Sequence, residues 1–80
     1  MANSYTGSIN TDGIYKSIAE VTDFTFTTGK TYAIQLQNLA YIKISNAEFV
    51  LQNEKFYYTA TADEIDIKTN EYVTLTILEL

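Results

Sequence analysis

Apolar and polar residues alternate one by one along much of this chain, and no other feature of the sequence constrains the fold as strongly. The alternation is clearest in residues 32–37, where Tyr32, Ile34 and Leu36 are separated by small or polar residues. A period of two places every second side chain on the same face of a β-strand, so this segment has one face for a core and one for water. Segment 32–37 therefore predicts the central strand of an all-β core.

The same alternation recurs at intervals of about 8 to 12 residues, between short polar stretches that rely on Asn and Asp for turns. Phe24 and Phe26 precede a turn at Gly29-Lys30, so they are expected to form a hairpin with segment 32–37. We expect further inward-facing side chains at Ile42, Ile44, Phe49, Leu51, Phe56, Tyr58, Ile65, Ile67, Val73, Leu75 and Ile77. The spacing predicts an all-β fold: a small antiparallel β-sandwich or jelly-roll-like barrel of about seven or eight short strands.

Residues 1–13 differ from the rest because they are polar apart from Tyr5 and Ile9, and Asp12-Gly13 is a strong turn signal. We therefore expect an N-terminal arm over residues 1–13 and a single β-sandwich domain over residues 14–80.

Residues 14–21 fit two structures. Ile14, Ile18 and Val21 would share one face of a helix, whereas Ile14, Lys16 and Ile18 could alternate along a strand. The strand is favoured because every later segment has the β pattern.

The composition excludes several classes of function. The chain has no Cys and no His, which removes thiolate metal sites and the commonest metal ligand and general base. Its net charge is −5 and its five Lys are scattered singly, whereas nucleic-acid binding needs a clustered basic surface. No apolar run approaches the roughly 18 to 20 residues of a membrane-spanning helix. We expect no cofactor, no nucleic-acid partner, no membrane association and no catalytic site.

Carboxylates form one dense group, Asp63-Glu64-Ile65-Asp66. Asp63 and Asp66 could offer oxygen ligands to Ca²⁺, but the ligand spacing and the glycine of an EF-hand loop are missing. Glu64 and Asp66 are better explained as the solvated face of a strand whose other face is apolar, so we expect no metal site here.

Large side chains at outward or terminal positions suggest contacts with other molecules. Tyrosine is useful at such places because its ring is apolar and its hydroxyl forms hydrogen bonds. The expected interface residues are Tyr5, Ile9, Tyr41, Tyr57, Leu78 and Leu80. An alternative is a small carbohydrate- or protein-binding module in which Tyr41 and Tyr57 form a platform.

Four segments carry a resemblance to a known group of proteins: Gly29 to Asn38, Asn53-Glu54-Lys55, Asp63 to Lys68, and Val73 to Ile77. Together they resemble the small β-sandwich proteins of tailed bacteriophage particles, which occur as head-decoration, head-fibre and tail-associated modules. The chain departs from them at Leu39-Ala40, where such proteins often have a glycine turn. The resemblance implies a non-enzymatic structural protein of the virion, made in the host cytoplasm. It also implies a homo-oligomer, with a trimer favoured, that attaches to other virion proteins.

Overall fold

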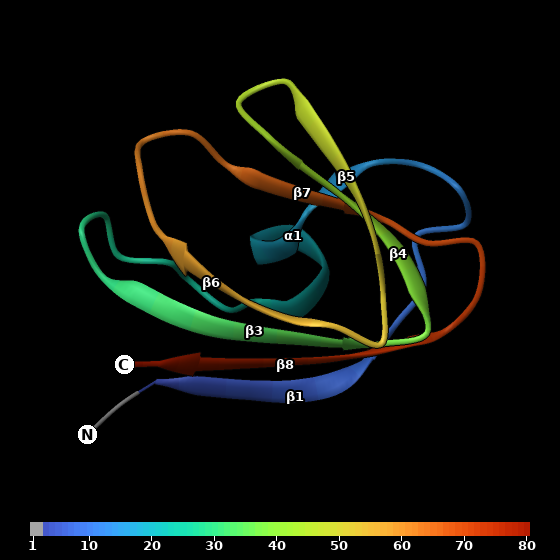
Figure 1. Cartoon of the computed structure of the whole chain (residues 1–80), viewed down its shortest axis with the longest axis horizontal. Helices are drawn as coiled ribbons and strands as arrows, with labels where there is room; N and C mark the ends of the chain where they lie inside the picture. The colour runs from blue at the N-terminus through green and yellow to red at the C-terminus, as the bar shows by residue number, and fades with distance from the viewer. Residues whose placement is uncertain (1–2) are drawn as a thin grey trace.

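A computed structural model describes residues 3–80 and shows eight strands and one short helix (Figure 1). The elements are β1 (Ser4–Ile9), β2 (Lys16–Ser17), α1 (Ile18–Thr22), β3 (Thr31–Gln37), β4 (Leu39–Ile44), β5 (Ala47–Gln52), β6 (Lys55–Thr59), β7 (Ile65–Lys68) and β8 (Val73–Glu79).

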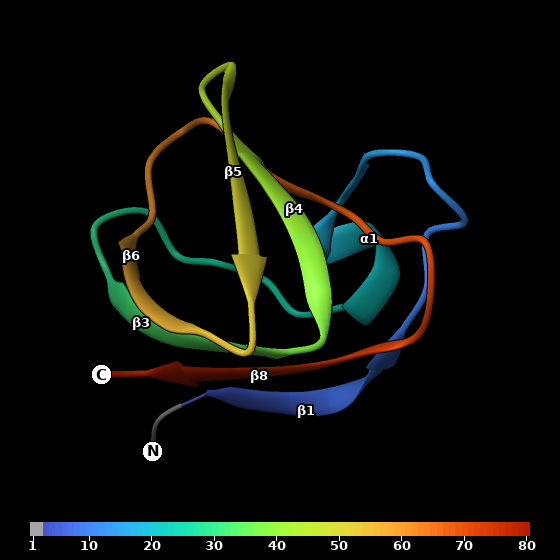
Figure 2. The same cartoon turned by 45° about the vertical axis from the view of Figure 1, so that its right-hand side comes forward.

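The strands form two four-stranded antiparallel sheets. Sheet A has the order β1-β8-β3-β6, and sheet B has the order β2-β7-β4-β5. Figures 1 and 2 show the two sheets as two layers of strands, and in Figure 1 α1 appears between them. The pairing of β1 with β8 brings the two ends of the described chain together. Of the two expected alternatives, the small antiparallel β-sandwich is confirmed.

The core consists of the side chains that the alternating pattern turns inward. Ile34, Leu36, Ile67, Leu75 and Ile77 are completely buried between the sheets. As expected, β3 is central: it pairs with β8 on one side and with β6 on the other.

Aromatic rings fill one end of the core. Phe26 contacts Tyr32 and Tyr58 edge to face, with ring centroids 4.9 and 5.5 Å apart, and Phe24 lies 5.1 Å from Phe26. The hydroxyl of Tyr32 accepts a hydrogen bond from the backbone N–H of Thr27. Phe24 and Phe26 are therefore core residues as expected, but their segment is irregular and forms no hairpin with β3.

Turns between strands use Asn and Ser in the left-handed backbone region. Ser45 and Asn46 have φ of 48° and 68° and join β4 to β5 in a two-residue hairpin. Asn38 and Asn53, with φ of 83° and 52°, join β3 to β4 and β5 to β6. Asn tolerates this region better than most residues, which explains how a chain with three Gly and no Pro makes so many turns.

The expectation of an N-terminal arm is wrong for the described residues. Residues 4–9 form β1, which pairs with β8 over its full length, and Ile9 is only 4% exposed. Thr11 and Thr69, both buried, join the next residues to the domain through three hydrogen bonds. The segment looked like an arm because its outward positions are Ser and Thr and its inward position 7 is Gly. Residues 1 and 2 lie outside the described part.

The expectation of a strand over residues 14–21 is also wrong. Only Lys16–Ser17 pair with β7, and the chain then turns into α1. The Ser17 hydroxyl caps this helix by accepting a hydrogen bond from the N–H of Glu20, and Asp23 ends it in the left-handed region. The helical alternative was correct for Ile18 and Val21, whereas Ile14 lies before the helix.

Candidate functional site

The outer face of sheet A carries almost no charge. Its outward side chains are Ser4, Thr6 and Ser8 from β1; Thr74, Thr76 and Leu78 from β8; Thr31, Ala33, Gln35 and Gln37 from β3; and Lys55, Tyr57 and Thr59 from β6. We call this set the neutral face. Lys55 is its one charged member, although the chain has ten acidic residues. None of those ten carboxylates occupies an outward strand position of sheet A.

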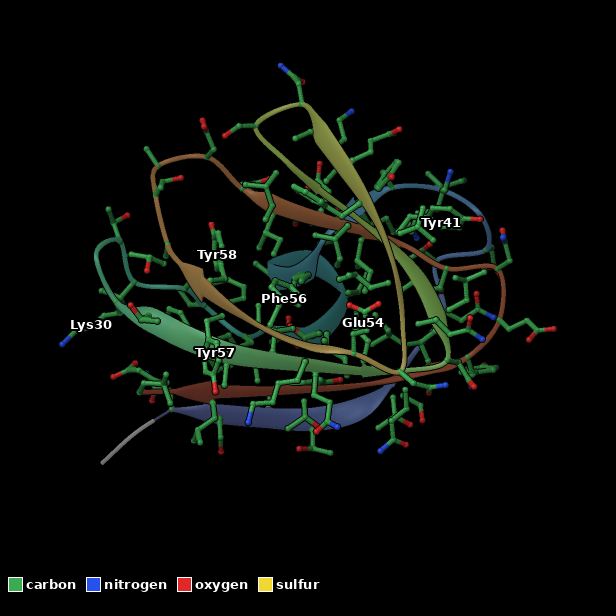
Figure 3. The ribbon with its side chains drawn as sticks, in the orientation of Figure 1. Lys30, Tyr41, Glu54, Phe56, Tyr57 and Tyr58 are labelled. Atoms are coloured by element: carbon green, nitrogen blue, oxygen red, sulfur yellow. The ribbon has the colours of Figure 1, made fainter. Side chains whose placement is uncertain are left out.

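Cross-strand contacts make the neutral face a regular surface. The hydroxyls of Thr31 and Thr59 lie 2.9 Å apart, and Thr6 donates to Thr76 at 3.5 Å. Leu78 and Tyr57 both lie opposite Ala33, so they flank one small residue in the same row. Their side chains are 44% and 63% exposed. Figure 3 shows Tyr57 and Tyr58 on opposite sides of β6, with Tyr58 directed into the sandwich.

The outer face of sheet B is charged and partly aromatic. The ammonium group of Lys68 lies between two rings, 4.6 Å from the centroid of Tyr41 and 4.9 Å from that of Tyr15. Lys43 lies 5.5 Å from the Tyr15 centroid. Asp66 and Glu48 are directly opposite Lys43 on the neighbouring strands β7 and β5. Cation–π and cross-strand charge pairs therefore stabilise this face internally.

Tyr15 is the member of that face whose hydroxyl group is poorly satisfied. Its hydroxyl oxygen is buried and forms no well-formed hydrogen bond among the described residues, although the Glu48 carboxylate lies near it. Burial opposes the charged phenolate, and the nearby Glu48 carboxylate adds repulsion, so both raise the pKa of Tyr15 above its ordinary value. The Tyr15 hydroxyl therefore holds its proton to a higher pH than an ordinary tyrosine does.

An apolar slot opens between the two sheets on the side of β5 and β6. It has a volume of about 270 Å³ and is lined by Ile42, Ile44, Phe49, Leu51, Phe56 and Tyr57. Phe49 lies opposite Ile42, which is 1% exposed, so it occupies an inward position; nevertheless, it is 49% exposed. The expectation that Phe49 is a core residue is therefore only half right: its ring lines the slot but remains in contact with solvent.

The three acidic residues of segment 63–66 do not come together as a set of metal ligands. Asp63 accepts a hydrogen bond from the Ser45 hydroxyl at 2.6 Å, and the Tyr58 hydroxyl donates to its carbonyl at 3.4 Å. A shallow polar hollow beside it is lined by Lys43, Ser45, Asn46, Ala62, Asp63, Glu64 and Asp66. Within residues 3–80, no three potential metal-binding side chains of the His, Cys, Asp and Glu types come together. The hydrogen bonds of Asp63 tie its turn to the β4–β5 turn and to β6.

The structure separates the expected interface residues into three groups. Tyr57 and Leu78 belong to the neutral face, and exposed Leu80 follows at the end of β8. Tyr41 lies on the opposite outer face, half-buried under Lys68, so Tyr41 and Tyr57 cannot form the carbohydrate platform that the sequence suggested (Figure 3). Ile9 is a core residue, and Tyr5 is half-buried on the inner side of β1, with its ring against Gly7.

Tyr15 and Val50 were not expected at these surfaces, and Phe49 was expected in the core. Val50 is 62% exposed on the outer side of β5. A signal was present in Glu48-Phe49-Val50-Leu51, where three apolar residues in a row leave one that cannot face the core.

Comparison with known proteins supports the fold alone. Neither a protein-family model nor a curated protein matches this chain. The chain is similar to the solution structure of a de novo designed double-stranded β-helix, with a TM-score of 0.69 and 13% identity over 98% of this chain and 99% of the other. Across residues 3–80 the structure contains no helix long and apolar enough to span a membrane.

Proposed function

We propose that this chain is a non-enzymatic structural protein that associates with copies of itself and with other proteins of a phage particle. The neutral face of sheet A is the observation that carries the proposal. Two copies that each bear a net charge of −5 repel one another, and contact is least unfavourable where neither copy presents carboxylates. A surface of Thr, Ser and Gln with Tyr57 and Leu78, whose one charged side chain is Lys55, allows such contact without burying a carboxylate.

The size of the face determines the strength expected of this contact. Four strands spaced about 4.8 Å apart, each with about six residues rising about 3.4 Å, cover roughly 400 Å² per copy. Two such faces bury about 800 Å², which is below the roughly 1,200–2,000 Å² of stable complexes. Association through one face is therefore weak and concentration-dependent, as suits a subunit that is held by several contacts in a particle.

The test is the molar mass of the full chain, measured by size-exclusion chromatography with light scattering over a range of concentrations. The parent is expected to show a mass above that of a monomer as concentration rises, with a trimer as the state implied by the phage resemblance. Leu78→Glu places a carboxylate at the centre of the face and should shift the mass toward that of a monomer.

Tyr72→Glu is the matched control. Tyr72 is 68% exposed in the loop before β8, outside both sheets, and its replacement makes the same change in net charge. The proposal fails if the parent is monomeric at every concentration, or if both variants reduce the mass equally.

A further inference from the structure

We infer that a second copy of this chain pairs with the free edge of β5, so that two four-stranded B sheets join into one continuous sheet about a two-fold axis. This contact builds on the proposed self-association but uses a different surface. Strand β5 ends the order of sheet B and pairs with β4 alone. Figures 1 and 2 both show the β4–β5 hairpin projecting from the rest of the molecule.

The backbone groups available at this edge follow from the hairpin. Ser45 and Asn46 form its turn, so Ile44 and Ala47 flank the turn as a hydrogen-bonded pair. Hydrogen-bonded and non-hydrogen-bonded pairs alternate along an antiparallel ladder. The N–H and C=O groups of Glu48, Val50 and Gln52 consequently point away from β4, toward the free edge.

One antiparallel register uses all three of these positions. It places Val50 opposite Val50 of the second copy, and Glu48 opposite Gln52 of the second copy. No charge then lies opposite a like charge, and the pair at the centre is β-branched, which suits a strand. Inward-facing Phe49 comes to lie opposite Leu51 of the second copy.

Apolar side chains at the slot add to the backbone hydrogen bonds of the proposed dimer. Leu51 lines the slot, so the register brings the half-exposed ring of Phe49 to the mouth of the other copy's slot. Because the axis is two-fold, the same burial occurs twice. Strand β1 is also a free edge, but its inner side is already covered by Tyr5 and Ile9, so pairing there would bury few additional apolar atoms.

Single cysteines test the register directly, because the chain contains no Cys. In the proposed pair the two Val50 Cα atoms lie about 5.5 Å apart, within the range of a disulfide. Phe49 and its equivalent are diagonal neighbours about 7 to 8 Å apart, too far for a bridge. Under mild oxidation, Val50→Cys should form covalent dimers at least about tenfold faster than Phe49→Cys, as expected for reactive groups held in place.

Tyr72→Cys measures the rate of random collision, since Tyr72 is at least as exposed as Val50. Equal rates for Val50→Cys and Tyr72→Cys overturn the inference, and a faster reaction of Phe49→Cys overturns the register. A non-covalent check uses Val50→Pro, which removes an N–H from the free edge and leaves the β4 ladder intact.

Measuring these variants in a Leu78→Glu background separates the two contacts. If β5 edges pair, the Leu78→Glu variant should still form some dimer, and adding Val50→Pro to it should give a monomer. If Leu78→Glu has the same mass as the parent while Val50→Cys still forms dimers rapidly, the neutral face is not an interface but the β5 contact is. If Leu78→Glu lowers the mass and Val50→Cys reacts no faster than Tyr72→Cys, the neutral face is an interface and the β5 edge is not.

Discussion

At the scale of single residues, Tyr15 is the clearest case of a polar group placed against its preference. Its hydroxyl is buried and forms no well-formed hydrogen bond, although Glu48 lies near it, and such a group loses its hydration with little compensation. The ring itself is well used, because the Lys43 and Lys68 ammonium groups contact its face. Ring and hydroxyl therefore have opposite effects on stability.

Replacing Tyr15 with Phe should separate the effect of the ring on stability from that of the hydroxyl. Since Phe keeps the ring and removes the poorly satisfied hydroxyl, the free energy of unfolding at neutral pH should stay constant or rise by up to about 1 kcal/mol. The raised pKa of Tyr15 means that the unfolded chain loses this proton first, so stability is fully present below about pH 10 and falls as pH rises further. Urea unfolding at several pH values should show a smaller alkaline loss for Tyr15→Phe than for the parent; an equal loss would contradict this account.

Ile34 measures how much one core residue contributes. It is completely buried in β3 between β8 and β6, so Ile34→Ala should cost about 2 to 5 kcal/mol. A domain of this size has little more than that in total, and the variant should be largely unfolded by circular dichroism. Gln35→Ala, on the exposed side of the same strand, should melt close to the parent. Similar melting temperatures for both variants would show that β3 is peripheral.

At the scale of elements, β1 links the beginning of the chain to its end. Its removal would expose the edge of β8, take Ile9 out of the core and break the hydrogen bonds between Thr11 and Thr69. Its neighbour β8 is a central strand, so its backbone groups would lose their partners along the whole of one edge.

Deleting residues 2–11 should therefore unfold the domain, whereas deleting only residues 2–3 should leave its melting temperature nearly unchanged. Far-ultraviolet circular dichroism and a thermal melt distinguish the two truncations. Retention of the β spectrum and of cooperative melting by the longer truncation would restore the view that this segment is a dispensable arm.

At the scale of the whole molecule, the alternation of apolar and polar residues was enough to predict individual strands. It could not predict features that depend on which strands lie side by side in the sheets. Strands β3, β4, β7 and β8 and the use of Asn in the turns follow from residues next to one another in the chain. Whether Phe49 is covered depends on β5 being the last strand of its sheet, a consequence of topology. The neutral face was invisible for the same reason, because its members come from four separate strands.

The charge distribution also determines how self-association should respond to salt. Two net charges of −5 separated by roughly 25 Å, close to one dimension of the molecule, repel by about 2 kcal/mol at about 10 mM salt and by about 0.2 kcal/mol at about 150 mM. The neutral face contributes no opposite-charge pairs that salt could weaken. Raising the salt concentration between these values should therefore lower the dissociation constant about tenfold, as measured by sedimentation equilibrium. Association through the Lys and carboxylate side chains of sheet B would instead weaken with salt, and that result would place the interface on the other side of the molecule.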